Sequence, residues 1–106
     1  MAAQRPSSAM DFGYLEGFAA GDTAVVREVL ILFGQQARLW IACLKAAAPD
    51  WRDVVHTIKG SARGVGASRL GDICARAEAD GIGGLPAVRA ALEAAVADIE
   101  AYLAQT

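Results

Sequence analysis

Apolar residues recur at intervals of three and four along most of this chain, and this spacing constrains its fold most strongly. An α-helix has about 3.6 residues per turn, so such a pattern places the apolar side chains on one face. The longest example runs through Val26, Val29, Leu30, Phe33, Ala37, Trp40 and Leu44. The sustained alternation of apolar and polar residues that indicates strands is absent from the sequence. We therefore expect an all-α protein.

Two helices are expected before Pro49, because a proline disfavours helical backbone in the residue that precedes it. The first is a short helix that closes at Gly21. The second begins where Asp22 or Thr23 can accept hydrogen bonds from free N–H groups, and it runs to about Ala47. The short helix presents three apolar residues at helical spacing: Phe12, Leu15 and Phe18.

Three further helices follow in the second half of the chain. Asp50 can cap the first of them, which is expected to weaken and end at Gly64 and Gly66. Ser68 is expected to cap the next, and the glycine-rich stretch 80–86 is expected to be a loop before the last helix. Four amphipathic helices with short connections favour an antiparallel four-helix bundle, here with a short additional N-terminal helix. We expect residues 1–9 to be a flexible N-terminus and residues 10–106 to form a single domain.

Composition narrows the classes of function. The 106 residues are 55% hydrophobic, enough for one packed domain, and the formal charge of −2 argues against nucleic-acid binding. The chain has no apolar run long enough to span a membrane and no signal-peptide pattern, so a cytoplasmic protein is expected. Cys43 and Cys74 fit no metal-ligand spacing; we expect both to pack in the core and predict no metal site or cofactor.

The stretch 54–66, VVHTIKGSARGVG, holds the only histidine of the chain. On a helix, Ile58 of the core face lies about 200° from His56, so the imidazole is expected to point outward. Lys59, Gly60 and Arg63 follow on the same side of the helix. A neutral imidazole is a competent nucleophile near neutral pH, and a nearby cation can screen a phosphoryl group bound to it. A surface histidine without function is the alternative from spacing alone.

The segment HTIKGSARGVG resembles the signature of histidine-containing phosphotransfer (HPt) domains. The resemblance extends over roughly residues 10–104, including the GD at 21–22, the segment DWRDVVH and the later LGDICARAE. A helix former is commoner in the family at the position of Gly64. The matching motif positions are His56, Lys59, Gly60, Ser61, Ala62, Val65 and Gly66.

The resemblance implies a phosphoryl carrier without ATP-dependent kinase activity of its own. His56 would accept a phosphoryl group, at Nε2, from the aspartate of a response-regulator receiver domain and pass it to another receiver. Lys59 would steady that group, and Gly60 would leave room for the receiver. Glu78 matches the family position that hydrogen-bonds the other imidazole nitrogen, and the alternative is a surface acid at a helix end. Arg63 either adds positive potential or is a solvated surface residue.

The partners implied are receiver domains and a hybrid sensor histidine kinase, with a divalent metal bound by the receiver rather than by this chain. The short connections are compatible with a closed monomer. Leu32 and Leu39 lie off the core face, where they either contact a receiver or pack beneath the first helix. Two other functions stay open: an adaptor or inhibitor that docks on a receiver without carrying phosphate, and a plain helical interaction module.

Overall fold

The computed structural model describes residues 10–45 and 49–105, and over those residues it contains helices and no strands. This confirms the all-α prediction. The predicted flexible segment 1–9 and the predicted end of the second helix at Ala47 lie outside the described residues. Among the residues described, no helix is both long and apolar enough to cross a membrane. The elements are α1 (Phe12–Phe18), α2 (Thr23–Lys45), α3 (Trp51–Gly64), α4 (Ser68–Asp80), the short 3₁₀ turn η1 (Ile82–Gly84) and α5 (Leu85–Ala104).

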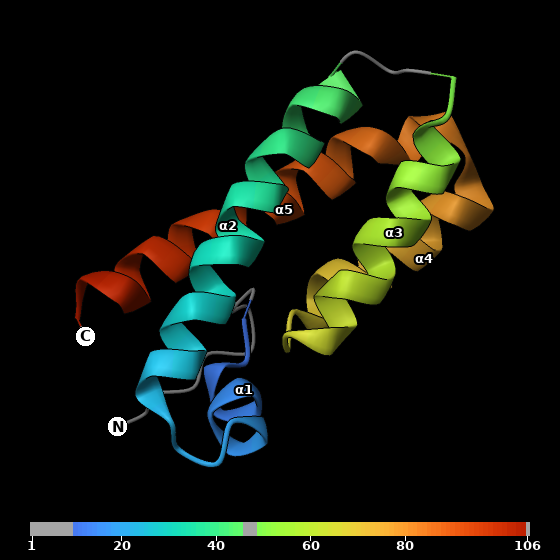
Figure 1. The fold of residues 1–106 in the computed structure, drawn as a ribbon. Helices are drawn as coiled ribbons and strands as arrows, with labels where there is room; N and C mark the ends of the chain where they lie inside the picture. Colours follow the sequence, from blue (N-terminus) through green and yellow to red (C-terminus); the bar gives the residue numbers. More distant parts are fainter. Residues whose placement is uncertain (1–9, 46–48, 106) are drawn as a thin grey trace.

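The four longer helices alternate in direction, so the bundle is antiparallel (Figure 1). α3 and α4 form a hairpin that packs along part of the longer pair α2 and α5. Because α3 and α4 have 14 and 13 residues against 23 and 20 in α2 and α5, the long helices extend beyond the hairpin. α1 lies at the N-terminal end of α2, beside this extension (Figure 1).

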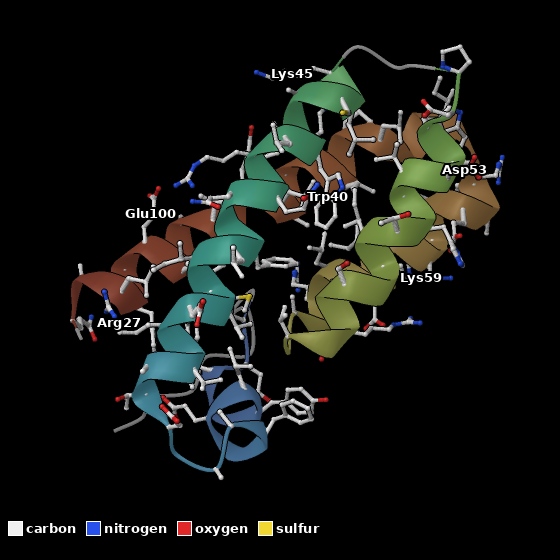
Figure 2. All side chains as sticks on the ribbon, viewed as in Figure 1. Arg27, Trp40, Lys45, Asp53, Lys59 and Glu100 are labelled. Atoms are coloured by element: carbon white, nitrogen blue, oxygen red, sulfur yellow. The ribbon has the colours of Figure 1, made fainter. Side chains whose placement is uncertain are left out.

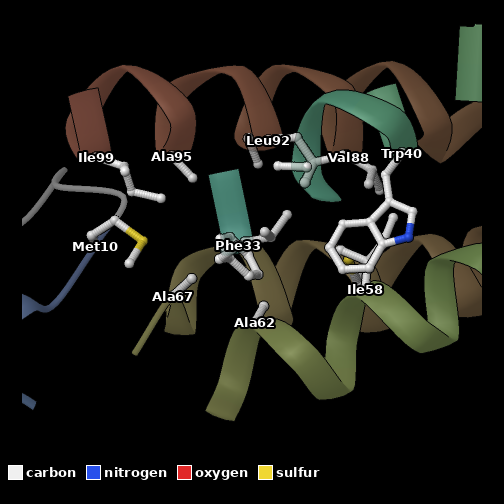
Figure 3. Packing of buried hydrophobic residues seen from close by; sticks show 14 of the residues in the cluster. Met10, Phe33, Trp40, Ile58, Ala62, Ala67, Val88, Leu92, Ala95 and Ile99 are labelled. Carbon is white, nitrogen blue, oxygen red and sulfur yellow. The ribbon is translucent and has the colours of Figure 1, made fainter. Parts of the chain in front are cut away.

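The core between the helices is apolar, and no polar or charged residue among those described is buried. Leu30, Ile58, Leu70 and Leu92 come from the four long helices, and each is at most 1% exposed. Figure 3 shows Phe33 and Trp40 of α2 beside Ile58 and Ala62 of α3, with Val88, Leu92, Ala95 and Ile99 of α5 nearby. Burial of a Leu or Ile side chain contributes about 1.5–3 kcal/mol, so this core dominates the stability of the bundle.

The residues at the start of α1 contact two other parts of the bundle. Phe12 stacks on Tyr102 of α5, with ring centroids 4.3 Å apart. The backbone N–H of Asp11 donates to the carbonyl of Gly66, at 2.9 Å, in the turn between α3 and α4. A Cβ at Gly66 would lie 2.8 Å from the Asp11 carbonyl oxygen, and the φ of Gly66 is +88°. Both the backbone conformation and the close approach therefore require glycine.

The helix caps agree in part with the predictions. The Asp22 side chain accepts hydrogen bonds from the N–H groups two and three residues ahead, at 3.1 and 3.2 Å. Asp50 occupies the N-cap position of α3 but its side chain makes no capping hydrogen bond. The prediction for Ser68 is wrong, since it is the first residue of α4 and Ala67 precedes it as N-cap. The chain leaves α3 through Gly66, and this turn brings Ala67 directly to the start of α4.

Two predicted positions differ in exposure. Both cysteines were predicted to pack in the core. Cys74 is buried, as predicted, whereas Cys43 is exposed, so the prediction is wrong for Cys43. The buried stripe of α2 ends with Trp40 and Leu44, and Cys43 lies about 100° from the centre of that stripe. Phe18, the last residue of α1, is 80% exposed despite its helical spacing. A helix of seven residues has too few turns to bury all three of its predicted apolar positions.

Candidate functional site

His56 lies in the second turn of α3 and faces away from the core, as its spacing predicted. Its side chain is 71% exposed, while Val55 and Ile58 on either side of it in sequence are completely buried. One ring nitrogen is engaged: Nδ1 lies 2.9 Å from Oε2 of Glu78 in α4. The exposed imidazole is thus held at one nitrogen by a neighbouring helix.

The two carboxylate oxygens of Glu78 contact two different side chains of α3. Oε2 contacts the Nδ1 of His56, and Oε1 accepts a hydrogen bond from the Nζ of Lys59 at 2.5 Å. The hydrogen bonds from Lys59 and then His56 lower the pKa of the Glu78 carboxyl below its ordinary value of 4.5. An ionised carboxylate can only accept, so His56 donates from Nδ1–H, and the lone pair of a neutral ring lies on Nε2.

Lys59 and Glu78 are much less exposed than His56. Their ammonium and carboxylate groups form an ion pair at the junction of α3 and α4, and Figure 2 shows Lys59 pointing toward α4. The sequence placed Lys59 on the side of His56, and the structure adds that its direct partner is Glu78.

Arg52 also binds Glu78, and the sequence analysis did not single it out. Its guanidinium donates to the backbone carbonyl of Glu78 at 2.5 Å and lies 4.7 Å from the ring centroid of Trp51. One signal was available, because Arg52 precedes His56 by four residues and therefore shares its side of α3. Its partner is a backbone carbonyl, which residue types do not reveal.

Gly60 and Arg63 differ in their relation to this cluster. A Cβ at Gly60 would meet no atom within 4 Å, so the surface one turn beyond His56 is open. Arg63 turns toward α4, where it pairs with Asp72 at 3.6 Å and covers Gly71. The structure therefore brings together His56, Lys59 and Glu78, with Gly60 adjacent, and directs Arg63 to a separate ion pair.

Cys74 lies in α4, one turn before Glu78, and is completely buried. Burial, followed by the charge of Glu78, raises the pKa of its thiol from 9.0 to about 11. The thiol stays protonated at neutral pH and is not a nucleophile. Within residues 10–45 and 49–105, no three potential metal-ligating side chains cluster together.

An open groove of about 410 Å³ runs between α2 and α3. It is lined by Val29, Leu32, Phe33, Gln36, Trp40, Ser61 and Val65. Beside it, exposed apolar residues recur every seventh position of α2: Val25, Leu32 and Leu39, which we term the α2 stripe. Leu32 and Leu39 are 58% and 62% exposed, so they do not pack beneath α1. The other role considered for them, contact with a receiver domain, stays a prediction.

The chain is similar to known proteins in both sequence and fold. The sequence profile of the Hpt domain matches residues 35–104. The solved structure of the histidine phosphotransferase ShpA from Caulobacter crescentus is 59% identical to the chain, covers 92% of each chain and superposes with a TM-score of 0.84. Among curated proteins there is no significant match. The profile match covers more than half of the sequence, and the chain therefore belongs to the Hpt domain family.

Proposed function

We propose that this protein carries a phosphoryl group on Nε2 of His56 between receiver domains of a two-component phosphorelay. Membership of the Hpt domain family and the similarity to a solved histidine phosphotransferase support the phosphotransfer role. The observation that carries the residue assignment is the contact between Nδ1 of the exposed His56 and the carboxylate of Glu78. This contact fixes the tautomer whose free lone pair lies on Nε2.

The transfer needs one nucleophile and one leaving group at each step. The Nε2 lone pair attacks the phosphorus of a receiver's phospho-aspartate, the new N–P bond forms, and the bond between phosphorus and the aspartate oxygen breaks. The aspartate leaves as a carboxylate, and the ring retains its Nδ1 proton and becomes cationic. Glu78 stabilises that charge through the Nδ1 hydrogen bond. In the second step a carboxylate oxygen of the next receiver attacks phosphorus, and the N–P bond breaks.

Lys59 and Gly60 have supporting roles in this proposal. Lys59 lies one turn from His56, and its positive charge steadies the negative phosphoryl group while its Nζ holds the Glu78 carboxylate. The open surface at Gly60 allows a receiver to approach Nε2. Arg63 adds positive potential, reduced by its pairing with Asp72.

The proposal also includes the partners. Receiver domains, one of them in a hybrid sensor histidine kinase, would dock over the exposed side of α3, the groove and the α2 stripe. The receiver would supply the divalent metal, and this chain would need no cofactor and have no kinase activity from ATP. A cytoplasmic monomer without affinity for nucleic acid or membranes is part of the same proposal.

The test is incubation with labelled phospho-receivers, comparing the unaltered protein with His56→Gln. Acid-labile, alkali-stable label is expected on the unaltered protein alone, while circular dichroism of the variant stays helical because His56 faces solvent. Since the chain has one histidine, phosphohistidine on the variant cannot occur, and any label there would have another chemical stability. Binding to receivers without label would instead indicate an adaptor or inhibitor, and neither binding nor label would indicate an interaction module.

A further inference from the structure

Arg52 joins the first turn of α3 to the last turn of α4. Its guanidinium donates to the carbonyl of Glu78, and the same residue presents its carboxylate to His56 and Lys59. Glu78 is therefore attached to α3 at two levels, by its backbone through Arg52 and by its side chain through Lys59. The backbone attachment sets where the Glu78 Cα lies, and the side-chain attachment sets where its oxygens point.

The end of α4 is where such an attachment has the largest effect. The last four carbonyls of a helix have no N–H donor within the helix, so the final turn frays easily. Glu78 lies in that turn, two residues before α4 ends at Asp80. A guanidinium there both satisfies one carbonyl and complements the negative end of the helix dipole. Glycine follows directly at 81, with φ +97°, so the chain beyond α4 turns away sharply.

The guanidinium is itself held in place by its neighbour. Its central carbon lies 4.7 Å from the centroid of the Trp51 ring, a distance at which the cation and the aromatic face attract each other. Trp51 is partly buried and packs against the core, so it is a fixed platform for Arg52. A flexible surface arginine is thereby restricted to a position from which it reaches the Glu78 carbonyl.

We propose that Arg52 is a positioning residue for the phosphoacceptor: by holding the last turn of α4 against α3, it keeps the Glu78 carboxylate in hydrogen-bond reach of His56 Nδ1. The inference rests on the proposed function of His56 and deepens it. Arg52 acts through Glu78, so its loss leaves the imidazole in place and weakens the constraint on its tautomer, because Lys59 alone then holds Glu78. Free imidazole populates both neutral tautomers, and only one of them has its lone pair on Nε2.

The experiment compares Arg52→Gln, Arg52→Lys and the control Arg76→Gln in the full chain. Arg76 is an exposed arginine of α4, outside the contacts with Glu78, and its substitution changes the net charge equally. The first readout is the pair of imidazole ¹⁵N chemical shifts of His56 without any receiver, which reports the tautomer. The second is the single-turnover rate of labelling at saturating phospho-receiver.

For Arg52→Gln we expect ¹⁵N shifts displaced toward a tautomer mixture and a saturating rate reduced roughly fivefold, the scale of the net contribution of one hydrogen bond. Arg52→Lys should recover part of both, since it keeps the charge but lacks the planar group that stacks on Trp51. Arg76→Gln should change neither. Should the glutamine variant fail to fold, Arg52→Lys alone provides the comparison with Arg76→Gln.

Two results would overturn the inference. One is an Arg52→Gln protein with unaltered ¹⁵N shifts and an unaltered saturating rate. The other is an effect confined to the receiver concentration at half-saturation and abolished by salt, which would make Arg52 a docking residue. Absence of label on the unaltered protein would refute the proposed function instead. The ¹⁵N shifts need no receiver and would still decide whether Arg52 positions the Glu78–His56 contact.

Discussion

Replacement of Leu32 and Leu39 by alanine should weaken receiver binding by an amount that the structure allows to be worked out. The two side chains are 58% and 62% exposed, so a docked receiver could remove that fraction from water. Full burial of a leucine side chain is favourable by about 1.5–3 kcal/mol, and the exposed part therefore accounts for about 1–2 kcal/mol. Alanine retains one carbon, which leaves an expected loss of about 1 kcal/mol per site.

A loss of that size raises the Kd roughly fivefold for each single variant. The two residues are seven positions apart, about 10 Å along the helix, so their effects should add. The double variant is expected to bind a receiver domain roughly 25-fold more weakly. Isothermal titration calorimetry with the isolated receiver measures this directly, and circular dichroism checks that both variants fold.

Ile31→Ala is the matched control, because Ile31 is also an exposed apolar residue of α2 but lines a groove against α5. Its Kd for the receiver should match that of the unaltered protein. An unchanged Kd for the double variant, together with normal labelling of His56, would show that the receiver does not cover the α2 stripe. A loss equal to that of Ile31→Ala would show a general effect of truncating α2.

Three further variants test the site itself. Lys59→Ala should slow labelling without abolishing it, since the nucleophile remains, and an unchanged single-turnover rate would remove Lys59 from the mechanism. Gly60→Gln should raise the free energy of unfolding by up to about 1 kcal/mol through helix propensity while raising the receiver Kd; undiminished binding in calorimetry would contradict the need for clearance. The pKa of Glu78 is lower in the folded chain than its ordinary value of 4.5. The ionised carboxylate therefore stabilises the fold at a pH above 4.5, and this contribution is lost as the pH falls through the lowered pKa of the folded chain. Urea unfolding of Glu78→Gln should therefore differ from the unaltered protein at neutral pH and converge with it in acid; a constant difference would refute this.

Helical periodicity predicted the fold well where a helix has many turns. In α2 the predicted core positions Val26, Leu30 and Phe33 are all buried. A long apolar stripe defines the buried face of a helix clearly, because many residues agree on its direction. The same reasoning failed for Cys43 near the end of that helix and for Phe18 in α1. Cys43 lies about 100° from the centre of the buried stripe, whereas its neighbour Leu44 is buried. Phe18 belongs to a helix with too few turns to bury all of its apolar residues.

The site was predictable to the extent that it depends on one helix. The outward direction of His56 and the open surface at Gly60 follow from angles along α3 alone. Glu78 was identified through the family resemblance, since spacing within one helix cannot place a residue of α4 against α3. The hydrogen bond from Arg52 to the backbone carbonyl of Glu78 depends on where α3 begins and α4 ends relative to each other, which only the structure shows.

The core and the polar cluster of His56, Lys59 and Glu78 differ in how much they contribute to stability, and this difference supports the chemical role proposed for the cluster. Every buried residue among those described is apolar, and its burial stabilises the bundle without any contribution from His56 or Lys59. Ion pairs near a protein surface stabilise folded chains only weakly, because solvent screens them and ordering long side chains costs entropy. A single carboxylate that orders the imidazole of one residue and the ammonium of another is therefore poorly explained by stability. It is well explained by the need to keep Nε2 free while Nδ1 retains its proton, which is the requirement of a phosphoryl acceptor.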